Sequence, residues 1–298
     1  MNEGQQAAAG KIWTTRFAPS PTGPLHLGHA YSALLAHDMA RAKGGRFLLR
    51  IEDIDHTRSR PHWEDAIYED LAWLGLSWDG VLRQSDRRAA YDRALDALWQ
   101  RGLVYACTCT RRDIQTAVTA PQEGDPPFGP DGIIYPGACR PITAPPRTAR
   151  PTQTVLRLNL RAVHAQLPEA RAFGFTETGH PKATARPLRD TLERMQAEVG
   201  DIVLSRRDFA ASYHLSVVLD DAHQGVSHVV RGRDLADATP IHVVLQRVLG
   251  LPTPIYHHHR LIRDAAGKRL AKRDNARALR TLRDAGLTPA DIRAQVGL

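Results

Sequence analysis

The sequence is poor in features that would place the protein outside the cell or in a membrane. Its 298 residues include three cysteines, too few for a disulfide framework. No run of 18 apolar residues occurs, so the sequence predicts no membrane span. Residues 1–10 lack a basic region followed by an apolar core and are interpreted as a loose tail. These absences predict a cytoplasmic protein that does not contact a membrane.

Length and charge leave the binding partner open. A chain of 298 residues is long enough for one large domain or two modest ones. Forty Lys and Arg against 32 Asp and Glu give a net charge of +8. Basic proteins often bind nucleic acid, because each cation that pairs with a phosphate releases a counterion. A GC-rich genome also raises the arginine content, so composition alone does not decide the matter.

The N-terminal part of the sequence has the pattern of a βαβ unit. Apolar residues 12–18 predict a strand, and residues 47–51 predict a second one. Apolar side chains recur at helical spacing from residue 27 to 35, and a Lys-Gly-Gly run predicts the end of that helix. The turn between the first strand and the helix is rich in proline and glycine. Backbone N–H groups and a helix N-terminus at such a turn suit a phosphate group.

Two histidines in this turn, His26 and His29, share one face of a first helical turn and can contact one ligand. A purely structural turn and a metal-binding pair are the alternatives. The full string over residues 16–29, RFAPSPTGPLHLGH, is more specific. It resembles the first signature of the glutamyl-tRNA synthetase group of class I aminoacyl-tRNA synthetases. The resemblance implies that His26, Gly28 and His29 bind ATP, and that the two histidines stabilise the phosphates during attack on the α-phosphorus.

An acidic cluster follows the second predicted strand. Residues 49–58, LRIEDIDHTR, lead from apolar residues into acids at a strand end, where open α/β sheets bind ligands. A solvated turn that caps a helix is the alternative. The synthetase group carries a similar Arg-Ile-Glu-Asp element. The resemblance implies that Glu52 faces the ammonium of the substrate amino acid, and that Arg16 and Ser20 also position it.

Three thiols flank a loop that is rich in proline, glycine and aspartate. Cys107 and Cys109 precede the loop and Cys139 closes it, which favours a tetrahedral zinc site over three unrelated thiols. No histidine lies between Cys107 and Cys139, so chemistry alone does not identify a fourth ligand. Short members of the synthetase group carry Cys-x-Cys and then Tyr-x-x-x-Cys. The resemblance to them implies that Tyr135 is the fourth ligand of one structural zinc ion.

The middle of the chain predicts more helices and strands. Residues 61–103 contain two amphipathic helical stretches, each ended by a glycine. Residues 154–160 and 200–204 predict strands, whereas residues 161–199 fit no clear pattern.

We interpret residues 106–210 as an inserted, zinc-containing subdomain that, in the resembling group, meets the tRNA acceptor end. Residues 11–105 and 211–298 are then two halves of one catalytic domain, after the loose tail of residues 1–10. The predicted fold class is α/β, with a class I synthetase Rossmann-type nucleotide-binding fold around this insertion.

Residues 213–235 predict a β-hairpin followed by a helix start. An apolar run, an acidic turn and a second apolar run ending at Arg231 lead to Asp234. A buried hairpin with charged ends is an equally good interpretation on chemistry alone. The synthetase group carries a tyrosine and an arginine at two of these places. The resemblance implies that Tyr213 and Arg231 contact the glutamate substrate, with two guanidinium donors on its side-chain carboxylate.

Three consecutive histidines, residues 257–259, precede a basic loop. Adjacent side chains on a strand point to opposite faces, so the three cannot easily bind one metal. The loop over residues 264–273, DAAGKRLAKR, resembles the second class I signature. The resemblance implies that Arg269 and Lys272 contact ATP, with Lys272 catalytic. Ala271 stands where the group usually has serine, and we expect this change to affect rate more than function.

The resemblance covers residues 11 to about 280, and the sequence ends at Leu298. Glutamyl-tRNA synthetases continue into an anticodon-binding domain, whereas residues 276–298 predict one or two short helices. This length favours the short members of the group, which attach glutamate to queuosine in the anticodon of tRNA(Asp).

The expected partners are therefore L-glutamate, ATP with Mg²⁺, and tRNA(Asp) carrying queuosine. We expect a monomeric ligase that activates glutamate without tRNA. Two alternatives stay open: a ligase that charges a tRNA 3′ end or another small acceptor, and an inactive RNA-binding paralogue.

Overall fold

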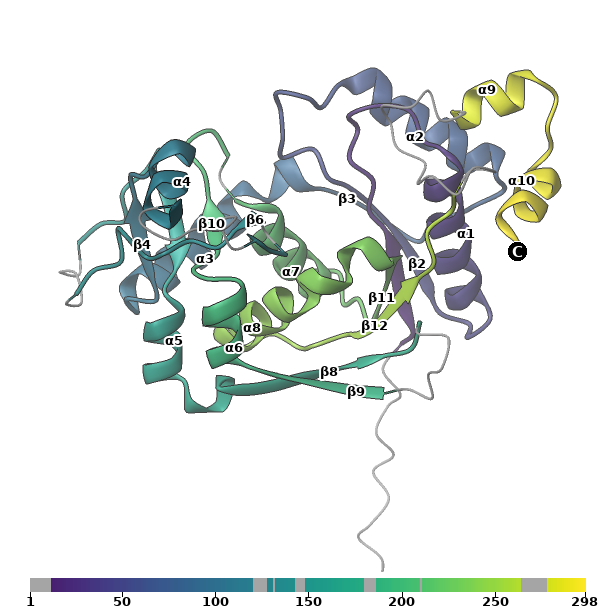
Figure 1. The fold of residues 1–298 in the computed structure, drawn as a ribbon. Coiled ribbons are helices and arrows are strands. Elements are labelled where there is room, and N and C mark those ends of the chain that lie inside the picture. The colour runs from purple at the N-terminus through teal and green to yellow at the C-terminus, as the bar shows by residue number, and fades with distance from the viewer. Residues whose placement is uncertain are drawn as a thin grey trace, which may run out of the picture.

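The computed structural model describes residues 12–119, 128–130, 132–142, 148–179, 186–209, 211–263 and 278–298, which form an α/β fold (Figure 1). The strands are β1 (Thr14–Phe17), β2 (Arg46–Ile51), β3 (Val81–Arg83), β4 (Val104–Cys107), β5 (Phe128–Gly129), β6 (Gly132–Ile133), β7 (Val155–Leu158), β8 (Ala172–Glu177), β9 (Arg186–Thr191), β10 (Val203–Ser205), β11 (His228–Gly232) and β12 (Ile255–His259). The helices are α1 (Leu27–Arg41), α2 (Pro61–Trp73), α3 (Arg88–Gln100), α4 (Arg111–Thr119), α5 (Leu160–Gln166), α6 (Leu192–Glu198), α7 (Tyr213–His223), α8 (Thr239–Leu249), α9 (Leu279–Asp284) and α10 (Pro289–Val296), with short 3₁₀ helices η1 (Gln84–Arg87), η2 (Pro168–Ala170) and η3 (Arg233–Ala238).

The central strands run parallel, and they come from both the N-terminal and the C-terminal part of the chain. β1 pairs with β2, β2 with β3, and β11 with β12, all in parallel. β1 also lies beside β11, where the Ser227 N–H donates to the Thr14 carbonyl at 3.0 Å. The order is therefore β3-β2-β1-β11-β12-β8, with β9 antiparallel at the edge. The order reverses at β1 and β11, which is where open α/β sheets bind ligands.

The predicted βαβ unit is confirmed as β1, α1 and β2. All four residues of β1 are buried, because elements cover both faces of a parallel strand. Helix α1 turns small and apolar side chains, among them Ala30, Leu34 and Ala40, toward the core. Just after α1, Gly44 has a φ of +59°, a left-handed conformation that glycine adopts readily. The glycine pair thus ends the helix, as predicted, and lets the chain return into β2.

The residues predicted to be inserted form a second, smaller sheet. β4, β7 and β10 pair antiparallel, and the two latter strands confirm the predictions for residues 154–160 and 200–204. The described part of residues 161–199, which leaves out 180–185, contains α5, η2, β8, β9 and α6, none longer than seven residues. Elements this short show too few repeats of a hydrophobic period to be recognised. β8 and β9 form a hairpin that returns to the central sheet through β8.

Two predictions for the core were wrong. Residues 213–223, predicted as the first strand of a hairpin, form helix α7, and only the second run is a strand, β11. Seven of the eleven residues of α7 are buried, and periodicity cannot separate a helix buried on most sides from a buried strand. β3 was missed between the two predicted helices, because three residues with exposed ends carry no pattern. The helix start near Asp234 is confirmed by η3 and α8.

Helices α9 and α10 confirm the prediction of short C-terminal helices. α10 packs on α1, where the Arg293 guanidinium donates to the Asp38 carboxylate at 2.7 and 3.1 Å. Thr288 caps α10 by accepting the Asp291 N–H at 3.3 Å. Of the helices that the described residues form, none has the length and apolar character needed to cross a membrane.

Candidate active site

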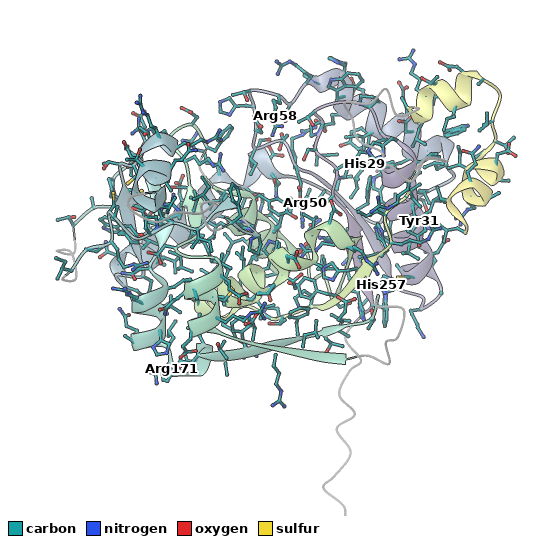
Figure 2. All side chains as sticks on the ribbon, in the orientation of Figure 1. His29, Tyr31, Arg50, Arg58, Arg171 and His257 are labelled. Atoms are coloured by element: carbon teal, nitrogen blue, oxygen red, sulfur yellow. The ribbon has the colours of Figure 1, made fainter. Side chains whose placement is uncertain are left out.

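A cavity of about 640 Å³ opens at the carboxyl ends of β1, β2 and β11. Figure 2 shows Arg50 near the middle of the molecule, with His29 and Arg58 above it. Every described residue that was predicted to bind glutamate or ATP lines this cavity. They are Arg16, Ser20, His26, Gly28, His29, Glu52, Tyr213 and Arg231. The two remaining predictions, Arg269 and Lys272, lie with Ala271 outside the described residues.

His26 and His29 form the start of α1. The Nδ1 atom of His26 accepts the Gly28 N–H at 3.1 Å, and the Nδ1 atom of His29 accepts the His26 N–H at 3.2 Å. Their ring centroids are 3.9 Å apart. A Cβ on Gly28 would come within 3.0 Å of the His26 ring, so glycine keeps this packing free of contact strain. Because both Nδ1 atoms accept, a neutral ring carries its hydrogen on Nε2, which makes both histidines donors at that atom.

Buried ion pairs form the base of the cavity. The Arg50 guanidinium, which is fully buried, donates to the Glu52 carboxylate at 3.0 Å. Arg16 donates through Nε to Asp221 at 3.0 Å, and Arg50 pairs with the same Asp221 oxygen. Burial raises the pKa of Glu52 above its ordinary value, although Arg50 opposes the shift. The cavity therefore presents a carboxylate whose charge is balanced mainly by one neighbouring guanidinium.

Sequence reasoning missed Arg50 and Asp221. Both sit in apolar runs, Arg50 within β2 and Asp221 near the end of α7. A charged residue inside an otherwise buried run is a usable signal, because such a charge is kept only with a partner. The sequence did not reveal which residues pair, since 171 residues separate Arg50 from Asp221.

Arg231 is buried in β11 and is enclosed by protein acceptors. Its Nε–H points at His258 Nε2 at 3.1 Å, and its Nη1 lies 3.1 Å from His242 Nδ1. Its Nη2 donates to the Leu235 carbonyl at 3.1 Å and to the Thr239 hydroxyl at 2.8 Å. Four of its five N–H groups are thus committed within the described part of the chain, and one Nη1–H remains for a ligand.

The three consecutive histidines do not converge, as the strand alternation predicted. His257 Nδ1 lies 3.0 Å from the Thr178 hydroxyl, and His259 Nδ1 lies 2.8 Å from its neighbour's carbonyl. His258 faces the opposite way and pairs with the Glu177 carboxylate. Three such rings cannot share one metal ion.

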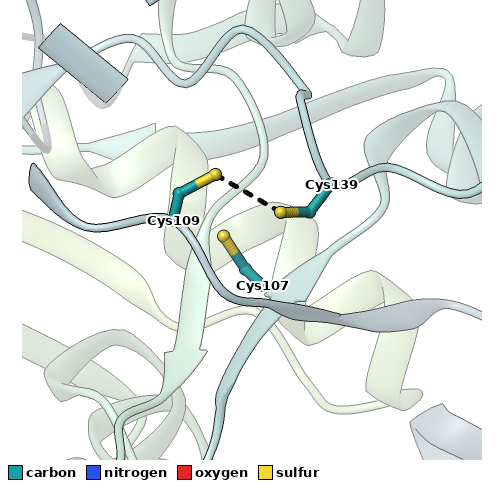
Figure 3. A group of neighbouring side chains, drawn as sticks. All are labelled: Cys107, Cys109 and Cys139. Atoms are coloured by element: carbon teal, nitrogen blue, oxygen red, sulfur yellow. Dashed lines mark hydrogen bonds between the residues drawn. The ribbon is translucent and has the colours of Figure 1, made fainter. Parts of the chain in front are cut away.

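The three thiols meet as the sequence predicted (Figure 3). The Sγ atoms of Cys107, Cys109 and Cys139 lie within 4.8 Å of one another. The Tyr135 hydroxyl is 3.4 Å from Cys107 Sγ and 3.5 Å from Cys109 Sγ. Four ligand atoms around a tetrahedral zinc, with sulfurs about 2.3 Å from the metal, lie about 3–4 Å apart. The donor set and its spacing therefore fit zinc.

Tyr135 is held by two further groups. It accepts the Cys139 backbone N–H at 2.7 Å, and the Arg157 guanidinium carbon lies 3.8 Å from the centre of its ring. Burial tends to raise the pKa of the Cys139 thiol, but hydrogen bonds from Tyr135 and the Thr108 backbone outweigh it and lower that pKa to about 6. Burial raises the pKa of the neighbouring Cys109 thiol to about 11, so Cys139 ionises before Cys109 and is the readier zinc ligand of the two.

Comparison with known proteins identifies the class. The sequence matches the family model described as tRNA synthetases class I (E and Q), catalytic domain, over residues 13–128 and 176–298. The chain therefore belongs to the class I tRNA synthetases of the E and Q group and is a ligase-type enzyme. Its relatives include the glutamyl-Q tRNA(Asp) synthetase of Rhodobacter capsulatus, 63% identical over 95% of this chain and 99% of that protein. The Nocardia farcinica protein of that name is 44% identical over 94% and 82%. Within the group, the chain belongs to the family of these glutamyl-Q tRNA(Asp) synthetases.

Solved structures agree with this family. A glutamate tRNA ligase from Elizabethkingia meningosepticum, solved in complex with its amino acid, matches 89% of this chain with a TM-score of 0.69 and 28% identity. The glutamate-tRNA synthetase of Elizabethkingia anophelis matches equally well, with 27% identity. The chain spans 52% and 53% of these two proteins. The match confirms the predicted α/β synthetase fold.

Proposed function

We propose that the chain activates L-glutamate with ATP, giving glutamyl-adenylate and pyrophosphate, and then transfers glutamate to queuosine in the anticodon of tRNA(Asp). One observation carries the proposal: a single cavity gathers two donor histidines at a helix N-terminus and a charged pocket around Glu52 and Arg231. The names of relatives 63% and 44% identical to this chain support the acceptor.

In the activation step, an oxygen of the α-carboxylate of glutamate attacks the α-phosphorus of ATP. Pyrophosphate leaves with the electron pair of the broken P–O bond. His26 and His29 would donate from Nε2 to the phosphates, and the N-terminus of α1 adds a partial positive charge. Mg²⁺ carried by ATP would offset further charge on the phosphates. Arg269 and Lys272 are assigned to the same task on the strength of the second signature alone.

The glutamate would lie between Glu52 and Arg231. Glu52 would pair with its ammonium, and Arg231 with its side-chain carboxylate, with Arg16, Ser20 and Tyr213 around them. Because one N–H of Arg231 is left for a ligand, we propose one charge-assisted hydrogen bond in place of the expected two. Charge still separates glutamate from glutamine, since the neutral amide lacks an anionic oxygen.

In the transfer step, a hydroxyl of the queuosine cyclopentene ring attacks the carbonyl carbon of the adenylate. An ester forms, AMP leaves, and the hydroxyl proton passes to solvent or phosphate. No protein nucleophile is needed. The chain's part is to hold the adenylate and the base together.

We also propose that Cys107, Cys109, Tyr135 and Cys139 hold one structural zinc ion. The spacing of the four donor atoms supports this assignment. Bound zinc would tie the end of β4 to the segment that holds Tyr135 and Cys139, and it would take no part in the reaction.

The domain division proposed from the sequence is retained with one refinement. Residues 11–105 and 211–298 form the catalytic halves around the insertion at 106–210. The family match omits only residues 129–175, so it supports an insertion that is shorter than the proposed one. The β8–β9 hairpin is then the part of the insertion that extends the catalytic sheet.

The activation step is tested by pyrophosphate exchange. Purified protein with ATP, glutamate and labelled pyrophosphate should form labelled ATP without tRNA. Absence of exchange under every metal condition would exclude activation by this chain alone, and the same assay with glutamine reports the role of charge.

The acceptor is tested with labelled glutamate and two forms of tRNA(Asp), one carrying queuosine and one a transcript without it. Label in the modified form alone supports the proposal. Label in both forms would instead support charging of the 3′ end.

A further inference from the structure

The middle residue of the histidine triplet belongs to a buried chain of hydrogen bonds that ends on Arg231. His258 is 6% exposed in β12, and its Nδ1 pairs with the carboxylate of Glu177 at the end of β8. The other Glu177 oxygen accepts the His258 backbone N–H at 3.1 Å and the Gly179 N–H. Three donors therefore fix this carboxylate directly behind the imidazole.

A second imidazole approaches Arg231 from α8. His242 is 2% exposed, its Nδ1 lies 3.1 Å from Arg231 Nη1, and its Nε2 lies 3.1 Å from His214 Nδ1. The Thr239 hydroxyl, which accepts from Arg231, is also 3.1 Å from His258 Nε2. The Arg231 guanidinium is thus contacted by side chains of two elements, β12 and α8.

The positions of the protons follow from these partners. A guanidinium only donates, so the nitrogens that face it on His258 and His242 must carry lone pairs. His258 then carries its hydrogen on Nδ1, where the Glu177 carboxylate accepts it. Burial lowers the pKa of both histidines and Arg231 adds to the shift, although Glu177 opposes it at His258; the net lowering keeps the rings neutral.

We infer that His258, oriented by Glu177, and His242 are positioning residues that hold the Arg231 guanidinium with one Nη1–H directed at the substrate carboxylate. This inference rests on the proposed role of Arg231 in binding glutamate. Glu177 and His258 also line a second cavity of about 650 Å³, so this network forms part of the wall between the two cavities. None of these positioning residues needs to contact glutamate itself.

The sharpest test is Glu177→Gln, which keeps the size of the side chain. The substituted amide is expected to keep its oxygen on the two backbone N–H groups and turn its NH₂ toward His258. The His258 ring must then accept at Nδ1 and carry its hydrogen on Nε2. Two N–H groups, those of His258 Nε2 and Arg231 Nε, would then face each other, and their hydrogen bond would be lost. We expect the KM for glutamate in pyrophosphate exchange to rise about tenfold, the loss of one hydrogen bond to a charged group, while the KM for ATP stays unchanged.

Matched variants separate positioning from folding. His257→Ala changes the neighbouring histidine, which faces Thr178, and should leave both KM values unchanged. His258→Ala should raise the glutamate KM by about tenfold or more, and His258→Gln, which can again offer an acceptor to Arg231, should recover part of the loss. Equal rises in both KM values, or no rise in either His258 variant, would overturn the inference.

Nitrogen-15 NMR of the histidines reads the tautomers whatever the activity. The wild-type protein should show His258 protonated on Nδ1, and Glu177→Gln should reverse this. A wild-type His258 protonated on Nε2 overturns the inference. Absence of exchange in the wild-type protein with the expected tautomers would instead count against the proposed function, so the two failures are distinguishable.

Discussion

Arg16 and Asp221 form a buried ion pair in which the guanidinium Nε lies 3.0 Å from the carboxylate, although 205 residues separate them in the sequence. The same carboxylate pairs with Arg50. Burial tends to raise the pKa of Asp221, but the two guanidinium groups outweigh it and hold that pKa below its ordinary value. One carboxylate therefore contacts two cations at the base of the cavity, and the second of them, Arg50, also pairs with Glu52.

We expect Asp221→Asn to impair both glutamate binding and stability. The change removes the carboxylate that Arg16 and Arg50 share and leaves Arg50 paired with Glu52 alone, which should lower the free energy of unfolding by about 3–5 kcal/mol. The KM for glutamate should rise about tenfold as Arg16 loses its fixed position. Urea unfolding and pyrophosphate exchange measure the two effects.

The adjacent Asp220 provides the matched control. Its carboxylate accepts from Tyr91 at 2.7 Å, Gln84 at 2.9 Å and Arg87 at 3.3 Å, and it is not among the residues that line the cavity. Asp220→Asn should therefore lose stability with an unchanged KM for glutamate. If both variants raised that KM equally, the effect of Asp221 would be one of folding alone.

Arg231→Ala should abolish measurable glutamate binding. The substrate carboxylate would lose its only proposed cation, and two imidazole lone pairs would lose their donor, so we expect the KM for glutamate to rise about 100-fold or more. Isothermal titration with glutamate, and exchange at saturating ATP, report the loss. Arg247→Ala, at an exposed position of α8, serves as the control. Unchanged affinity in Arg231→Ala would remove this residue from the site.

The KM for glutamate should rise at acid pH because of Glu52. Burial raises the pKa of Glu52, so as the pH falls this carboxylate takes up a proton before an ordinary one does and no longer pairs with the substrate ammonium. Glu52→Gln should bind glutamate weakly, and its KM should not rise at acid pH through protonation of residue 52. Any pH dependence that remains in this variant reports the titration of glutamate itself. Identical profiles for the two proteins would show that Glu52 does not face the ammonium.

The protein should bind about one zinc ion through its thiol cluster. Metal analysis of the purified chain should find zinc, and Cys139→Ser should remove it and lower the thermal midpoint. Tyr135→Phe keeps the ring beneath Arg157 but lacks the oxygen, so it should release zinc faster to a chromophoric chelator. Equal release from Tyr135→Phe and the wild-type protein would exclude the phenol as a ligand.

Asp70 in α2 provides a stability test away from the site. Burial raises the pKa of Asp70 to about 6, with Arg283 opposing the shift from 4.0 Å away. Above pH 6 the folded protein therefore holds a poorly solvated charge, and stability from this group is gained as the pH falls through 6. Asp70→Asn should raise the free energy of unfolding by about 2 kcal/mol at pH 8, and this advantage should shrink toward pH 4.

The control for this prediction is Asp65→Asn, on the exposed side of the same helix. Urea unfolding of the three proteins at pH 8, 6 and 4 gives the comparison. A wild-type protein less stable at pH 6 than at pH 8, with Asp70→Asn showing the same change, would contradict the assigned pKa.

The signatures in the sequence located the cavity residues, because His26, Glu52 and their neighbours follow strand ends that a βαβ pattern reveals. Their partners could not be predicted in the same way. Asp221 lies in α7, whose buried apolar residues resemble a strand, and its pairing with Arg16 depends on how two distant halves of the sheet meet. Local periodicity carries no information on which distant strands and helices pack together.

The hydrogen-bond partners of Arg231 also could not be predicted from the sequence. Two parallel donors were expected from it, yet His258 and His242 occupy donors that a free guanidinium would offer. The histidine triplet was recognised only as unsuited to one metal. Which of its rings turns toward Arg231 follows from the register of β12 beside β11, where Arg231 is opposite His258.

The placement of β1 between β2 and β11 also bears on how the site forms during synthesis. β1 meets β2 across one short crossover, but it meets β11 only after 213 further residues have been made. Because distant pairings must close a long loop, the β1–α1–β2 unit can form while the ribosome is still translating the insertion, but His26 meets its bridge partner Ala278 only near the end of synthesis. The side proposed to bind glutamate, which needs Asp221 and Arg231, is also completed late, so a nascent chain carries the first strands and helix of the fold before it carries a complete cavity.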